Sequence, residues 1–152
     1  MADGLWRRAI RYLQSEGGYS LMWWAAFALF VLGPLLAFSI EVGRYARAAG
    51  EVQKAADAAA LAAAYHIDVE WFQRTGHLRF NDKAAGVAMT FANADTGYLG
   101  QYGIGVHVAG MDLDDATRMV RVQCVADISL LFPRWMPQIV IRKEGVAESR
   151  VW

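Results

Sequence analysis

The chain has little of the material from which catalytic or metal sites are commonly built. It contains one cysteine, Cys124, among 152 residues, which excludes an internal disulfide framework and a CxxC metal site. The three histidines, His66, His77 and His107, have no metal-ligand spacing with one another or with the cysteine. The sequence also lacks a nucleophile elbow, a phosphate-binding loop and a paired-carboxylate motif. We therefore expect no enzyme, no cofactor and no metal site.

An excess of positive charge is also lacking. Fifteen Lys and Arg residues balance fifteen Asp and Glu residues, so the formal net charge is zero. Because phosphate binding needs concentrated Lys and Arg, we expect no nucleic-acid partner. Asp112, Asp114 and Asp115 resemble part of a calcium loop, but the central glycine and the closing glutamate are missing. We interpret them as part of a solvated turn.

Charge of either sign is missing from Gly17 to Ile40. As a helix this run is about 36 Å long, and it exceeds the roughly 20 residues that cross a bilayer. A buried core helix of this length would normally show one polar face, and the apolar core of a secretory signal is shorter. We therefore predict a transmembrane helix at residues 19–41. The stretch ARAAG at 46–50 leaves a cleaved signal as the alternative.

Aromatic and charged residues mark both ends of the predicted span. The predicted membrane-interface residues are Trp6, Tyr19, Trp23 and Trp24. The pattern of residues 1–18 predicts an amphipathic helix in the headgroup plane, with a frayed basic leader as the alternative. At the other end, Glu41 and Arg44 are spaced for an ion pair, although Glu41 could instead meet a basic group of a partner protein. Three basic residues precede the span and three follow it closely, so charge alone does not orient it.

The helical pattern continues beyond the span with small residues. Alternating steps of three and four residues give a heptad-like seam. The predicted helix-packing seam consists of Val42, Tyr45, Ala49, Val52, Ala56, Ala59 and Ala63. Small side chains let a neighbouring backbone approach closely, and alanine has the best helix propensity. We expect one helix from about Tyr19 to about His66, whose seam packs on its own domain or on other subunits. A simple helical stalk is the alternative.

The rest of the chain, residues 67–152, predicts a small extramembrane domain. We expect a mixed linker to residue 79 and a helix at about 82–94. Three strands follow at 104–109, 118–128 and 139–146, separated by an Asp-rich turn at 111–117 and a prolyl loop at 131–137. A sheet of so few strands needs a helix to complete its core. The predicted fold is α+β, with the long helix packed on a small antiparallel sheet as in pilins. The predicted division is 1–18, 19–41, 42–66 and 67–152.

Two motifs resemble a known family. The span closes on Glu41, Gly43 and Arg44, and an alanine signature follows at 56–62. Over residues 18–64 the sequence resembles the TadE/TadG-like pilus-assembly proteins of the tight-adherence (Flp) system. The resemblance implies a non-enzymatic, single-pass assembly or minor pilin-like subunit of the bacterial inner membrane. It also implies a cytoplasmic N-terminus and an extracytoplasmic C-terminal domain. Trp23 stands where a prepilin cleavage site after Gly18 would need glutamate, so we expect a permanent anchor.

Two other functions stay open at this point. One is an accessory single-span subunit of a large respiratory or photosynthetic membrane complex, which the tryptophans and the in-plane leader would suit. The other is a soluble periplasmic binding module released from its signal. For the pilus-assembly subunit and for the accessory subunit, the expected partners are the lipid bilayer and other membrane-protein subunits. Both would be contacted through the transmembrane and alanine-rich helix.

Overall fold

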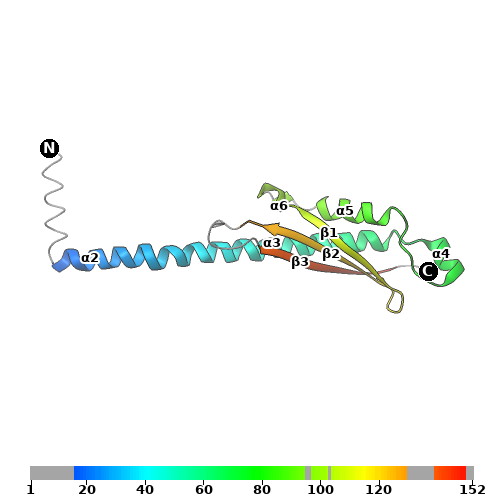
Figure 1. The fold of residues 1–152 in the computed structure, drawn as a ribbon, viewed down its shortest axis with the longest axis horizontal. Helices are drawn as coiled ribbons and strands as arrows, with labels where there is room; N and C mark the ends of the chain where they lie inside the picture. Colours follow the sequence, from blue (N-terminus) through cyan, green and yellow to red (C-terminus); the bar gives the residue numbers. More distant parts are fainter. Residues whose placement is uncertain (1–15, 95–96, 103, 130–138, 150–152) are drawn as a thin grey trace. The chain divides into compact units, whose positions relative to one another are not determined.

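The computed structural model describes most of the chain and divides it into two compact units. The described residues are 16–94, 97–102, 104–129 and 139–149. The first unit is Met1–Gly43 and the second is Arg44–Trp152. The predicted α+β fold is confirmed, because a long apolar N-terminal helix packs on a three-stranded antiparallel sheet (Figure 1). The predicted in-plane segment, up to residue 15, and the prolyl loop lie outside the described residues.

The first unit is helical throughout its described part. Helix α2 spans Glu16–Phe27, a π-helical turn, η1, spans Ala28–Leu32, and α3 begins at Gly33. The π-turn ends two residues before Pro34, which has no N–H to continue the hydrogen-bond ladder. The N–H of Gly33 donates to the Ala28 carbonyl, five residues back instead of four. The helix therefore accommodates the proline by widening one turn.

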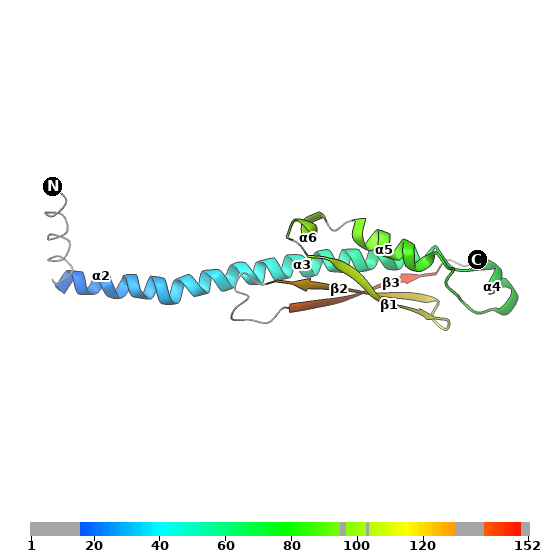
Figure 2. The ribbon, with the colours of Figure 1, turned by 45° about the horizontal axis from the view of Figure 1, so that its top comes forward.

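In the second unit, α3 continues to Ala64 and forms the middle of the core. The completely buried side chains of its core face are almost all alanine, with Val52 as the one larger residue. Helix α5, Ala84–Ala94, lies beside α3 in both views and buries only alanines on its inner face (Figures 1 and 2). Because these faces carry small side chains, the helix axes can approach one another and the sheet closely.

The sheet has the order β1-β2-β3, with both pairs antiparallel. Its strands are β1, Val106–Asp114, β2, Met119–Ile128, and β3, Ile139–Glu148. Side chains alternate between the two faces of a strand. In β2 this alternation buries Val120, Val122, Cys124 and Ala126 and leaves the residues between them on the outer face. A β-bulge interrupts the pairing of β1 between Val108 and Gly110.

Two elements were not predicted from the sequence. The segment predicted as a linker contains helix α4, Val69–Thr75, which Asp68 caps by accepting the Trp71 N–H at 3.0 Å. Gly76 ends this helix in the left-handed conformation, with φ of 74°. A short helix, α6, spans Gly97–Gln101.

The predicted turn at 111–117 was wrong in its first half. Residues 111–114 continue β1 and pair with β2, because Met111 and Leu113 pack against the core. The hairpin loop is therefore only residues 115–118. Arg118 closes this loop with φ of 55°, the one described non-glycine residue with positive φ.

Candidate membrane span and helix-sheet junction

Large apolar side chains cover the helix of the first unit on all sides. Fifteen of them between residues 19 and 42 are exposed. They are Tyr19, Leu21, Met22, Trp23, Trp24, Phe27, Leu29, Phe30, Val31, Leu32, Leu35, Leu36, Phe38, Ile40 and Val42. The described chain contains one helix that is long and apolar enough to cross a membrane, and the most apolar part of it is not buried at all. This segment is therefore not part of the core of the described chain.

The aromatic residues at the start of this helix contact one another in pairs. The rings of Tyr19 and Trp23 meet edge to face with centroids 6.3 Å apart, and those of Trp24 and Phe27 do so at 5.9 Å. Edge-to-face pairs of this kind stabilise a fixed ring orientation. The tyrosine hydroxyl and the indole N–H groups suit a membrane-water interface. The assignment of these residues to the interface stays a prediction. Trp6 lies outside the described residues.

The seam divides into a buried and an exposed part. Val52, Ala56, Ala59 and Ala63 are completely buried in the second unit. Ala49 packs partly against the same core, whereas Val42 and Tyr45 are 49% and 41% exposed. The chain's own α+β domain therefore covers the four buried members. A packing role between subunits stays a prediction for the two exposed ones.

Helix α3 and strand β3 come into backbone contact at Gly145. A Cβ atom at this position would collide with the carbonyl group of Ala56 and would lie 2.6 Å from the Asp57 nitrogen. Beside this contact, Gln53 Nε2 donates to the Glu144 carbonyl at 2.9 Å and to Asp57 Oδ1 at 3.0 Å. Only glycine fits between the two elements here. The sequence signal was a lone glycine inside a strand pattern, which often marks a close backbone approach.

Carboxylates in the β1–β2 hairpin accept hydrogen bonds from backbone N–H groups. Asp115 accepts the Leu78 N–H at 2.7 Å and pairs with His77 Nδ1 at 3.1 Å. Both hydrogen bonds lower the pKa of Asp115, and the bond from the Leu78 N–H has the larger effect. Hydrogen bonds from Thr117 are the main cause that lowers the pKa of Asp114. Within the described residues no three His, Cys, Asp or Glu side chains are placed to hold a metal ion.

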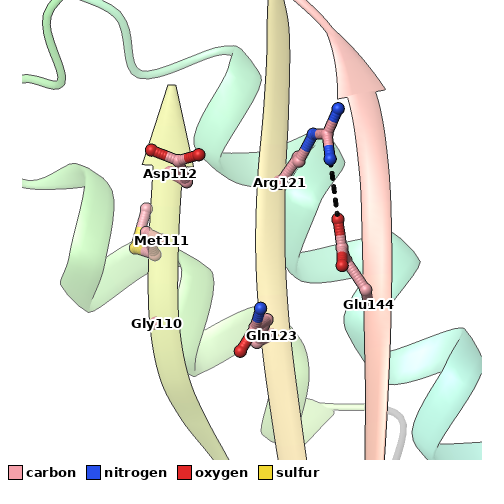
Figure 3. A pocket seen from close by; sticks show the side chains of 6 residues that line it. All are labelled: Gly110, Met111, Asp112, Arg121, Gln123 and Glu144. Atoms are coloured by element: carbon pink, nitrogen blue, oxygen red, sulfur yellow. Dashed lines mark ion pairs between the residues drawn. The ribbon is translucent and has the colours of Figure 1, made fainter. Parts of the chain in front are cut away.

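A hollow of about 250 Å³ lies on the outer face of the sheet (Figure 3). It is lined by Gly110, Met111, Asp112, Arg121, Gln123 and Glu144. Arg121 Nη1 and Glu144 Oε1 are 3.7 Å apart and both side chains are about half exposed. An exposed ion pair of this kind contributes little to stability, and it prepares neither side chain for catalysis. The lining holds no serine, cysteine, lysine or histidine, so the hollow offers no nucleophile and base pair.

Cys124 is buried in the core, and burial raises the pKa of its thiol. A reactive cysteine needs the opposite, an exposed thiol with a lowered pKa. Cys124 therefore packs as a small apolar side chain.

Arg44 stacks on an aromatic ring of a distant segment. Its guanidinium carbon lies 5.6 Å from the centroid of the Tyr102 ring, the geometry of a cation–π contact. No sequence pattern indicated this contact, since the two residues lie on separate elements. The predicted ion pair between Arg44 and Glu41 stays a prediction.

Residues 18–66 match the model of a protein family described as "Putative Flp pilus-assembly TadE/G-like". The match confirms the resemblance over this segment and supports a role related to pilus assembly. The description names an assembly role and no reaction. No curated protein and no solved structure matches the chain. The family match and the exposed apolar helix together favour a membrane-anchored protein.

Proposed function

From the TadE/G-like segment and the helix that contains it, we propose that the protein is a non-enzymatic, membrane-anchored structural subunit in pilus assembly. In this proposal residues 19–41 cross the inner membrane. Residues 1–18 lie in the cytoplasmic headgroup plane, and the second unit is the extracytoplasmic domain. Its partners are other membrane-protein subunits of the pilus apparatus.

The exposed apolar surface of the first unit is the observation that carries this proposal. Moving one large apolar side chain out of water is favourable by about 1.5 kcal/mol or more. For the fifteen exposed side chains the sum is on the order of 20 kcal/mol. A monomeric protein in water rarely leaves so large a continuous apolar surface uncovered. A bilayer supplies the matching solvent over the whole circumference of the helix.

The second unit supports a structural role because one core cluster holds its helices and strands together. Its core cluster joins α3, α5 and all three strands. The one large helix, α3, contributes its first residues to the proposed span and its last residues to this core. The same element therefore serves as anchor and as scaffold, which suits a subunit that presents a surface to neighbours.

Fractionation of the full-length chain tests the anchor. The wild type should stay with membranes after extraction with alkaline carbonate. Replacing Leu29 and Phe30 together by Arg should release it or block insertion, because each Arg at the centre of a span costs about 2.5–3.5 kcal/mol. The matched control replaces Leu61 and Tyr65, exposed residues of the second unit, in the same way and should leave the protein in the membrane. Release of the wild type by carbonate would refute the anchor.

Purification in mild detergent tests the partners. The proposal predicts that pilus-assembly proteins co-purify with the tagged full-length chain. Consistent recovery of cofactor-bearing subunits instead would overturn the pilus role and support the accessory-subunit function.

A further inference from the structure

Two segments far apart in the sequence meet at the start of the second unit. Arg44, its first residue, stacks on the ring of Tyr102, as described above. Tyr102 follows α6, and its N–H donates to the Leu99 carbonyl at 3.0 Å. The same carbonyl accepts the Ile104 N–H at 3.0 Å, and Leu99 is completely buried. A fixed turn therefore holds Tyr102, although 49% of the residue is exposed.

The position of Arg44 in the chain sets the depth of this pair. Arg44 is the fourth residue after Ile40, the last residue of the uncharged run, and both belong to α3. At 1.5 Å per residue, the two are separated by about 6 Å along the helix. The headgroup layer on each side of a bilayer is about 5–8 Å thick. If the hydrocarbon ends near Ile40, Arg44 lies among the phosphates. The ring centroid of Tyr102 is then only 5.6 Å from the guanidinium carbon at that depth.

The chemistry of the pair suits this depth. Tyrosine is enriched at membrane interfaces because its ring is apolar and its hydroxyl is polar. A guanidinium stacks through its flat face and donates to phosphate oxygens through its edge, so both contacts are compatible. Arg47 is exposed and lies one helical turn beyond Arg44. Two cations and a tyrosine therefore gather within about one helical turn, and the long side chain of Arg47 can reach back toward the headgroups.

We infer that Tyr102, Arg44 and Arg47 form a docking surface through which the second unit rests on anionic phospholipid headgroups. The inference rests on the proposed membrane span and adds a second membrane contact, made by residues outside that span. It gives α6 a role, which is to carry Tyr102 to the bilayer surface. The contact limits tilting of the domain and so fixes the face that it presents to other subunits.

Depth measurement with a nitroxide label tests the inference in the full-length chain. Single labels are placed through Gln101→Cys, Gln73→Cys and Phe30→Cys. Gln101 and Gln73 are both exposed, and Gln73 lies in α4, away from the proposed surface. The native thiol, Cys124, is buried and stays unlabelled. Vesicles contain either phosphatidylethanolamine with one quarter phosphatidylglycerol or phosphatidylcholine alone.

We expect the label at 101 to be shielded several-fold from a water-soluble nickel chelate, relative to the label at 73. Each basic residue near an anionic surface strengthens membrane binding about fivefold. Shielding at 101 should therefore fall in phosphatidylcholine and after Arg44→Gln with Arg47→Gln. Tyr102→Ala should reduce it in both lipids.

Equal exposure of the labels at 101 and 73, with the label at 30 in lipid, would overturn the docking surface and leave the span intact. Exposure of the label at 30 to the chelate would instead refute the span itself. Shielding at 101 that is independent of both arginines and of lipid charge would also overturn the inference, because it would indicate cover by protein.

Discussion

The backbone contact at Gly145 yields the sharpest test of the fold. Gly145→Ala adds one methyl group where α3 and β3 already touch. The new Cβ would lie 2.6 Å from the Asp57 nitrogen and closer still to the carbonyl group of Ala56. Ordinary contact begins at 3.4 Å, so the helix and the strand must separate by at least 0.8 Å, the difference between these two distances.

Several free-energy terms set the size of the effect. Overpacking of this kind costs about 1–3 kcal/mol. Separation also weakens the hydrogen bond from Gln53 to the Glu144 carbonyl, which is worth about 0.5–1.5 kcal/mol. The better strand propensity of alanine offsets this loss of stability by about 0.5–1 kcal/mol. The net loss is about 2 kcal/mol, or a fall in Tm of about 8 °C for a unit of this size.

Labelling of Cys124 provides the assay, because the thiol lies in the same buried core cluster as Ala56. The full-length chain in detergent is heated in steps, and the fraction of thiol that reacts with a maleimide is measured at each temperature. Gly110→Ala is the matched control, since a Cβ at Gly110 in strand β1 meets nothing within 4 Å. Its midpoint should not fall, and the strand propensity of alanine should raise it by about 2–4 °C.

A midpoint for Gly145→Ala that equals that of the wild type would refute the close approach. A second variant tests the cause. Ala56→Gly should not rescue Gly145→Ala, because the collision is with the Ala56 backbone and not with its side chain. Full rescue would mean that side-chain bulk separates the two elements.

Three further predictions follow from other contacts. Ala59→Leu should lower the free energy of unfolding by about 1–3 kcal/mol, since Ala59 is completely buried, whereas Lys54→Ala on the exposed face should cost about 0.5 kcal/mol or less in the same denaturant titration. Asp115→Asn should destabilise the protein at neutral pH. Because the folded-state pKa of Asp115 is lowered, its contribution is present above the ordinary carboxyl pKa and is lost as pH falls through the folded-state value. The gap between the two denaturation midpoints should therefore narrow as the pH falls below the ordinary carboxyl value of 3.8, and a constant gap would contradict this. In the native state Cys124 should react with maleimide at least about 100-fold more slowly than after unfolding, because its thiol is buried and has a raised pKa.

The sequence revealed most clearly the elements with strong periodicity. The alternation in β2 and the alanine face of α5 predicted both elements to within a few residues. Helix α4 was not predicted because it has only seven residues. Its aromatic side chains were interpreted as docking residues of a linker. Its end signals were present, with Asp68 at the start and Gly76 at the end. Contacts from elsewhere in the chain stabilise it, including the stacking of Arg118 on Phe72 at 5.9 Å.

The identity of packing partners could not be read from periodicity. A stripe of alanines has the same spacing whether it faces the chain's own sheet or another subunit. The deciding feature is Gly145, which lies about ninety residues further along and matches the helix only in three dimensions. Likewise, no local pattern connects Arg44 to Tyr102.

The π-turn at Ala28–Leu32 changes the rotational phase of the helix within the first unit. One extra residue in a turn rotates everything before it by about 100° relative to everything after it. Trp23 and Trp24 therefore point in directions that a regular helix drawn back from residue 40 would misassign. Deletion of a single residue from this turn would leave composition and apolarity almost intact, yet it would aim the tryptophans at a different set of neighbours.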